Sequence, residues 1–314
     1  MKKIMMYLVL TVIACNLNSH GTIAYRITEK DLIPEGITWS AATHSFYVSS
    51  INLKKIVRVD AATGACSDFV TPDVLEMVFL GMMVDDSQSY LWACGNITDG
   101  SEHYSSVSQF DLETGELIKC DMLSDSSNTL FNDLALDQAG NVFITNTQQN
   151  RIYLIDAQTG VLQMFLDSDE IPNPNGITIS PDNKYLYVAT GDQGIRIIDI
   201  AAREIINTPD PAIDTNGLDG IKFYKNSIVG VHNGDGNWYV AQYLLNDTGT
   251  QITGRRIIDE KNPLFNIPTT CVIVDDAVYW LANSQMDHMD WDTRTIINPE
   301  TLVDNLILKK NLGR

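Results

Sequence analysis

The chain has 314 residues, of which 44% are hydrophobic and 19% are charged, and its formal net charge is −19 at pH 7. This length and hydrophobic content are enough for one large domain, or two small ones, with a buried core. A surface so acidic repels phosphate backbones and anionic lipid headgroups, which argues against nucleic-acid binding and peripheral membrane binding. It favours cations, although most acidic side chains only solvate a surface and do not by themselves indicate a metal site.

The N-terminus has the pattern of an export signal. Lys2 and Lys3 precede an apolar run over residues 4–14, which is too short to span a bilayer but typical of a signal peptide. We therefore expect a signal peptide within residues 1–20 and an exported domain over residues 21–314. No second apolar stretch of membrane length follows, so we expect no transmembrane span after signal removal.

The end of the apolar run leaves two fates for the N-terminus open. Residues 12–15 resemble a lipobox, in which Cys15 would carry the lipid anchor of a periplasmic or cell-envelope lipoprotein. Ordinary cleavage shortly after Cys15 is the alternative, and it gives a secreted protein without an anchor.

A turn motif of the form Asp-x-x-Thr-Gly occurs three times, and each copy closes a short strand with alternating polar and apolar residues. The aspartate can accept hydrogen bonds within the turn, and the glycine supplies the positive φ that a hairpin needs. The turns cover residues 60–64, 111–115 and 156–160, after strands predicted over 56–59, 107–110 and 152–155.

A second signature opens each repeat with an anchor residue, a short apolar strand, a polar turn and a further strand. The anchors, at spacings of 45, 52, 43, 44 and 50 residues, are Glu35, Leu80, Asn132, Asn175, Asp219 and Thr269. A period of this length with about four short strands per unit indicates a β-propeller. Six units predict an all-β, six-bladed β-propeller over residues 21–314. One of the terminal strands, over residues 22–27 or 306–309, should complete a blade and close the ring.

The anchors predict a metal site in the central channel. The first strand of each blade lines that channel, so anchors far apart in sequence converge there. Glu35, Asn132, Asn175 and Asp219 all carry side-chain oxygens, and buried carboxylates need a positive partner. Calcium accepts carboxylate and amide oxygens without histidine or cysteine. Asn-Gly and Asp-Gly also form ordinary turns, but their shared register favours the metal.

The chain resembles the SMP-30/gluconolactonase/LRE-like propellers, relatives of the paraoxonases, from about residue 34 to residue 283. The resemblance rests on four motifs in order, over residues 34–36, 132–137, 174–176 and 219–220. It implies that Glu35, Asn175 and Asp219 bind Ca²⁺ or another hard divalent cation. It implies that Asn132 contacts substrate, or a metal as in the paraoxonases.

Two positions depart from the family pattern. Sugar-lactone hydrolases of the family have an arginine two residues before the Asn-Asp motif, where this chain has Leu130. Their acidic substrate contact falls near Asn150, which carries no charge. A polyhydroxylated lactone would lose two polar contacts, so the sequence argues against gluconolactone itself as the substrate.

Other catalytic patterns are absent from the sequence. It contains no GxSxG, P-loop or HExxH motif and no CxxC pair, which argues against serine hydrolase, nucleotide-binding and zinc chemistry. The body cysteines are expected to be buried free thiols. His103 and His232 could reach a channel mouth, but no motif includes them, and we interpret them as surface or core residues.

Two functions from different classes remain. The first is a metal-dependent hydrolase of a small-molecule lactone or ester, in which Asp219 binds the metal and activates water while Asn132 orients the substrate. The second is a non-catalytic binding or scaffold propeller, secreted or attached to the cell envelope, with a structural calcium ion.

Overall fold

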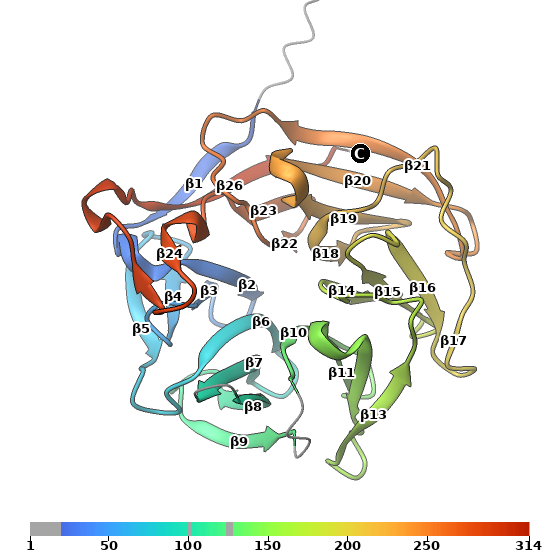
Figure 1. Cartoon of the computed structure of the whole chain (residues 1–314), viewed down its shortest axis with the longest axis horizontal. Helices are drawn as coiled ribbons and strands as arrows, with labels where there is room; N and C mark the ends of the chain where they lie inside the picture. The colour runs from blue at the N-terminus through green and yellow to red at the C-terminus, as the bar shows by residue number, and fades with distance from the viewer. Residues whose placement is uncertain (1–19, 100–101, 124–127, 314) are drawn as a thin grey trace, which may run out of the picture.

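The computed structural model describes residues 20–99, 102–123 and 128–313. Over these ranges the strands form six four-stranded antiparallel sheets, which stand like blades around a central axis (Figure 1). The prediction of an all-β, six-bladed propeller is confirmed. The predicted signal peptide, except for its last residue His20, lies outside the described residues, as do the lipobox and Cys15. No helix in the described part of the chain is long and apolar enough to cross a membrane.

Blades 1 to 5 follow the chain from the inner strand to the outer strand. Blade 1 contains β2 (Pro34–Ser40), β3 (Ser45–Ser50), β4 (Ile56–Asp60) and β5 (Cys66–Val70). Blade 2 contains β6 (Val78–Asp85), β7 (Tyr90–Asp99), β8 (Glu102–Asp111) and β9 (Leu117–Met122). Blade 3 contains β10 (Phe131–Leu136), β11 (Val142–Asn146), β12 (Arg151–Ile155) and β13 (Leu162–Asp167). Blade 4 contains β14 (Ile177–Ile179), β15 (Tyr185–Ala189), β16 (Ile195–Asp199) and β17 (Glu204–Ile205). Blade 5 contains β18 (Leu218–Phe223), β19 (Ser227–His232), β20 (Tyr239–Leu245) and β21 (Ile252–Glu260).

Blade 6 combines the two ends of the chain. Its strands, from inner to outer, are β22 (Cys271–Val274), β23 (Ala277–Leu281), β26 (Asn305–Asn311) and β1 (Thr22–Ile27). The sequence predicted that one terminal strand closes the ring, and the structure uses both, because β26 pairs with β23 and β1 pairs with β26. Phe46 of blade 1 packs against two strands of this closing blade. Its ring centroid lies 5.3 Å from that of Tyr25 and 4.9 Å from that of Tyr279, and we call these three residues the aromatic seam.

The three predicted turns form as their sequence requires. Gly64, Gly115 and Gly160 have φ values of +75°, +75° and +65°, in the left-handed region that glycine tolerates best. In the third turn, Asp156 accepts hydrogen bonds from the backbone N–H of Thr159 at 2.9 Å and from its hydroxyl at 3.2 Å. In blades 1, 2 and 3, five consecutive residues therefore specify the turn that joins the third strand to the outer strand.

The core lies between neighbouring blades. One cluster, for example, packs Tyr47 and Ile56 of blade 1 against Met82 and Leu91 of blade 2. Of the body cysteines, which are all free, Cys94 and Cys271 are buried as expected, whereas Cys66 is exposed and Cys120 is half-buried.

The connection from β23 to β26 carries an insertion that the repeat did not predict. It contains the short hairpin of β24 (Met289–Asp290) and β25 (Thr295–Ile296), drawn in red in Figure 1. The 3₁₀ turns η4 (Met286–His288) and η5 (Pro299–Thr301) flank this hairpin. We call residues 283–304 the blade 6 insertion.

Candidate active site

The inner strands of blades 1, 2, 3 and 5 share an irregularity at the anchor residue. In β2, β6, β10 and β18 the pairing with the second strand shifts register at the anchor and the residue after it. In blade 5 this shift lies between Leu218 and Ile221, and so it brackets Asp219. A β-bulge adds a residue on one strand and re-aims the side chains there. In these four blades the bulge therefore re-aims the anchor relative to the rest of its strand.

The glycine that follows an anchor lets neighbouring inner strands approach each other closely. A Cβ atom on Gly176 would lie 2.4 Å from the carbonyl oxygen of Asp219, and one on Gly220 would lie 1.9 Å from Oγ1 of Thr270. The N–H of Gly176 donates to the same Asp219 carbonyl at 3.2 Å. The recurring Asn-Gly and Asp-Gly pairs therefore serve contact between blades, because any side chain at the second position would clash.

A cavity of about 410 Å³ opens at this end of the channel. The four oxygen-bearing anchors Glu35, Asn132, Asn175 and Asp219 all line it, although they come from blades 1, 3, 4 and 5. The structure therefore brings together every residue that the sequence singled out for the site. The volume is within the range of pockets that bind small molecules.

Glu35 is a buried carboxylate that the protein does not satisfy. Its side chain is 7% exposed, and its Oε2 atom has no hydrogen-bond partner among the described residues. Burial raises the pKa of Glu35 well above its ordinary value, and the charges of Asp219 and Asp133 raise it further, while Lys222 opposes them. An unpartnered buried oxygen of this kind is costly unless a ligand completes it.

Asp219 is also 7% exposed, but other side chains hold it in place. Asn233, on the loop between β19 and β20, donates from Nδ2 to Oδ2 of Asp219 at 2.5 Å. Burial raises the pKa of Asp219 to about 7; hydrogen bonds from Asn233 and Asn175 oppose the shift, and the charge of Asp133 adds to it. Asn233 was not predicted as a site residue, because it belongs to no sequence motif and meets Asp219 only through the fold.

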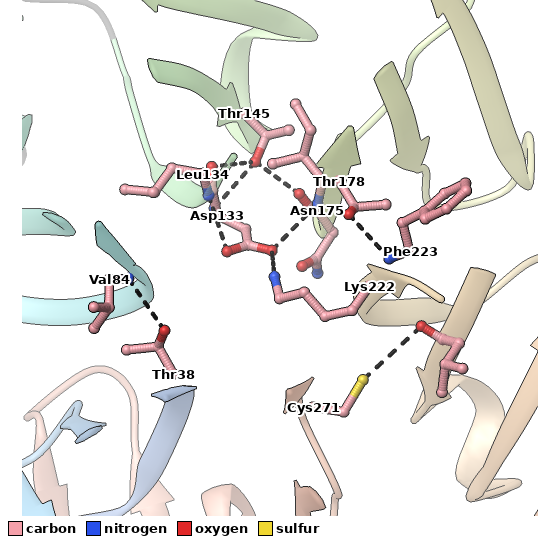
Figure 2. Close-up of polar contacts among 12 residues, drawn as sticks. Thr38, Val84, Asp133, Leu134, Thr145, Asn175, Thr178, Lys222, Phe223 and Cys271 are labelled. Carbon is pink, nitrogen blue, oxygen red and sulfur yellow. Dashed lines mark hydrogen bonds and ion pairs between the residues drawn. The ribbon is translucent and has the colours of Figure 1, made fainter. Parts of the chain in front are cut away.

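A buried ion pair lies near the anchor Asn175, as Figure 2 shows. The Nζ atom of Lys222 lies 3.2 Å from Oδ2 of Asp133, and both side chains are about nine-tenths buried. Asp133 also accepts hydrogen bonds from the backbone N–H groups of Leu134 at 2.9 Å and Ile177 at 3.2 Å. Lys222 was missed as well, although one lysine in the buried inner strand of blade 5 is a usable signal, because a buried lysine needs a partner.

The donor set fits a hard cation that takes amide oxygens in addition to carboxylates. In residues 20–99, 102–123 and 128–313, no three His, Cys, Asp or Glu side chains gather closely enough to hold a metal ion. Glu35 and Asp219 offer two carboxylates, so a cation here would also need the amide oxygens of Asn175 or Asn132 and water. Calcium accepts such a set, whereas zinc prefers nitrogen and sulfur ligands.

The positions that depart from the family pattern lie in different places. Leu130 lines the channel cavity, so an apolar side chain stands where an arginine would. Asn150 does not line it; its Oδ1 atom accepts the N–H of Asn173 at 3.0 Å.

The two histidines considered in the sequence lie in different cavities. His103 lines the channel cavity. His232 lines another cavity of about 800 Å³ next to blades 4 and 5, and none of the four anchors lines that cavity.

The fold and the site define a class of protein, a six-bladed propeller whose inner strands present carboxylate and amide side chains at one end of the channel. A model of the SMP-30/gluconolactonase/LRE-like region matches residues 33–223, which is more than half of the chain. The chain belongs to this family.

Solved structures of other propellers share the fold at low sequence identity. The Malassezia sympodialis allergen Mala s 1 has a TM-score of 0.68 at 14% identity, and the match covers 90% of this chain and 94% of the allergen. A Xanthomonas campestris gluconolactonase has a TM-score of 0.61 at 14% identity and covers 92% and 88% of the two chains. The calcium-binding protein regucalcin from Agrobacterium tumefaciens has a TM-score of 0.59 at 18% identity and covers 93% and 96%. A search of curated proteins found no match.

Proposed function

We propose that this protein is a divalent-metal-dependent hydrolase of a lactone or an ester, with calcium as the metal. One observation carries the proposal: Glu35 is buried with an unpartnered oxygen, in the same cavity as Asp219, Asn132 and Asn175. Family membership supports lactone chemistry, since the family takes its name partly from gluconolactonase. The regucalcin neighbour, described as calcium-binding, supports the choice of metal.

Glu35, Asn175 and Asp219 would hold the metal through their side-chain oxygens. When bound, a divalent cation supplies positive charge that polarises the ester carbonyl and stabilises the negative charge on the tetrahedral intermediate. Asn132, which lines the same cavity, orients the substrate by hydrogen bonding through its amide. Asn233 fixes the orientation of the Asp219 carboxylate.

Asp219 acts as the general base and then as the acid. It accepts one proton from a water molecule as the water oxygen bonds to the carbonyl carbon. The bond from this carbon to the ester oxygen then breaks, and the same proton passes to the leaving oxygen. A lactone gives a hydroxy acid, and an open ester gives an acid and an alcohol, with one water consumed in either case.

The proposal is tested by assaying a panel of lactones and esters with added calcium and with a chelator. We expect turnover that the chelator abolishes, together with a lower melting temperature, because an ion that binds only the folded state stabilises it by mass action. Asp219→Asn should reduce kcat by about 10²–10⁴-fold with an unchanged circular dichroism spectrum. Asp192→Asn is the control, since Asp192 is exposed and does not line the channel cavity.

Two other outcomes have clear meanings. If the chelator changes neither the melting temperature nor the turnover rate, in protein shown to be metal-free by elemental analysis, the metal site would be refuted. Melting that responds to the chelator, without turnover of any compound, would favour the non-catalytic propeller with a structural calcium ion.

We also propose that the protein acts after export, as a secreted protein or as a lipoprotein anchored through Cys15. The support is the basic and apolar pattern of the N-terminus. Mass spectrometry of the mature N-terminus in the native host distinguishes a lipidated Cys15 from a free terminus beyond it, and a mature chain that still begins at Met1 would refute export.

A further inference from the structure

The channel cavity has two chemically different sides. Its lining contains the oxygen-bearing anchors and, as a second group, apolar side chains from blades 1, 2 and 3 and from the blade 6 insertion. Six residues define what we call the apolar wall: Ile51, Val78, Leu80, Leu130, Met286 and Trp291. We propose that this wall binds the apolar body of the substrate, so that the substrate is a lactone or ester with an alkyl or similarly apolar group. The inference deepens the proposed function and rests on it.

The wall is preformed. Ile51 and Leu80 are buried members of one core cluster, and Val78, Leu130 and Met286 pack against the same cluster. Side chains held in this way keep their positions when a ligand arrives, so little conformational entropy is lost on binding. These five residues of the wall therefore form a fixed surface rather than a group of mobile side chains.

Several polar residues that border the wall are already satisfied within the protein. The Nδ2 atom of Asn96 donates to the carbonyl oxygen of Phe131 at 2.8 Å, and its Oδ1 atom accepts a hydrogen bond from the Ser105 hydroxyl at 2.7 Å. The hydroxyl of Thr129 also bonds to Ser105, at 3.2 Å, and Asn128 donates to Gln148 at 3.2 Å. Substrate hydroxyls placed against Asn96 and Thr129 would give up hydrogen bonds to water without equal replacements from these two residues, and such losses disfavour a polyhydroxylated ring there.

Trp291 extends the apolar wall to the mouth of the cavity. It lies between β24 and β25 and is 51% exposed, although it lines the cavity. The hairpin that presents it is anchored, because Met289 is buried in the same core cluster and Ile296 packs against it. The turn is ordered by Asp290, which accepts the N–H groups of Asp292 at 2.9 Å and Thr293 at 3.1 Å. A large ring held half-exposed beside a cavity is available for contact with a ligand.

The test measures kcat/KM, with added calcium, for γ-lactones whose alkyl side chain grows one methylene at a time, and for gluconolactone. Each methylene that reaches the wall should raise kcat/KM about fourfold, which corresponds to about 0.8 kcal/mol per buried CH₂. Gluconolactone should be a poorer substrate than the longer alkyl lactones. A rate that ignores chain length, or a preference for gluconolactone, would overturn the inference.

The variant Trp291→Ala should lower kcat/KM of the longest lactones relative to the shortest, so that the chain-length dependence ends earlier. Ile297→Ala is the matched control: it belongs to the same insertion and is 44% exposed, but does not line the cavity. An equal chain-length dependence in Trp291→Ala and wild type would show that Trp291 does not contact the alkyl group of the substrate.

Binding separates this inference from the proposed function. The matched alkyl γ-lactams, whose amide bond resists hydrolysis, are titrated into the protein by calorimetry. A Kd that falls with chain length, without turnover of any lactone, would refute the hydrolase and leave the apolar wall standing. Turnover of lactones without any chain-length dependence, in rate or in lactam affinity, would refute substrate binding by the apolar wall and leave the hydrolase standing.

Discussion

At the scale of single residues, the two carboxylates of the site differ in how the protein treats them. Glu35 has an oxygen without a partner, whereas Asp219 is held by a short hydrogen bond from Asn233. Lys222 compensates a third carboxylate, Asp133, and so supplies one positive charge within the channel. Of these three carboxyl groups, those without a positive partner are therefore Glu35 and Asp219, where we propose the cation.

The hydrogen bond from Asn233 to Asp219 gives a prediction for metal affinity. Asn233→Ala should weaken calcium binding by about 10–100-fold, as removal of a group that orients a metal ligand generally does. Titration calorimetry measures the Kd directly, without any need for a substrate. Asn237→Ala is the control, since Asn237 lies on the same loop but is exposed. An unchanged Kd in Asn233→Ala would mean that Asn233 does not position Asp219 for a cation.

At the scale of structural elements, two local devices recur in the blades. The Asp-x-x-Thr-Gly turns join the third strand to the outer strand in blades 1, 2 and 3, and a bulge at the anchor interrupts the inner strands of blades 1, 2, 3 and 5. The turns use hydrogen bonds within five residues. The bulges depend on contacts between blades, such as that of Gly176 with the Asp219 carbonyl.

The turn aspartates predict a specific dependence of stability on pH. Hydrogen bonds from Thr159 lower the pKa of Asp156, and the equivalent threonines lower the pKa values of Asp60 and Asp111. A carboxyl with a lowered pKa in the folded state stabilises the fold fully above its unfolded pKa, which is about 3.9. This stabilisation is lost as the pH falls through the lowered folded pKa.

The measurement is urea unfolding of wild type and Asp156→Asn at pH 7 and at about pH 3. We expect Asp156→Asn to be less stable than wild type at pH 7, with a smaller difference at the acidic pH, because proton uptake by the carboxyl of the unfolded wild type reduces the stabilisation. Asp169→Asn, at an exposed position outside the repeated turns, serves as the control. A deficit that is equal at both pH values would show that the ionised carboxylate does not stabilise the turn.

At the scale of the whole molecule, the ring is closed by pairing of strands from both ends of the chain. The outer strand β1 is held by β26, and the aromatic seam of Tyr25, Phe46 and Tyr279 packs blade 1 against this closure. Just before β1, the backbone N–H of Gly21 donates to the buried carboxylate of Asp259 in β21 at 2.8 Å. Closure therefore joins the first described residues to blade 5 as well as to blade 6.

The seam predicts where the propeller opens first when it is weakened. Phe46→Ala should destabilise the fold by about 3–5 kcal/mol, as loss of a fully buried phenylalanine usually does, and should speed hydrogen exchange in β1 and β26. Phe143→Ala is the matched control, because Phe143 is equally buried at the corresponding position of blade 3 and contacts Phe165 of its own blade. Similar exchange of β1 in both variants would contradict a special role for the seam.

The sequence by itself determined the number of blades, the turns and the residues that converge on the channel. It could do so because a turn depends on neighbouring residues, and because a repeat places equivalent positions at equivalent sites in a ring. Glu35, Asn132, Asn175 and Asp219 therefore could be assigned to one place from their register alone.

The tertiary structure alone decided which residues surround these anchors. Asn233 reaches Asp219, Lys222 meets Asp133 across 89 residues, and Trp291 comes to the cavity on an insertion that breaks the repeat. The pairing of both chain ends in blade 6 was likewise decided by contacts between distant parts of the chain. Such contacts depend on how separate blades and loops pack together, and a local pattern or a period carries no record of that packing.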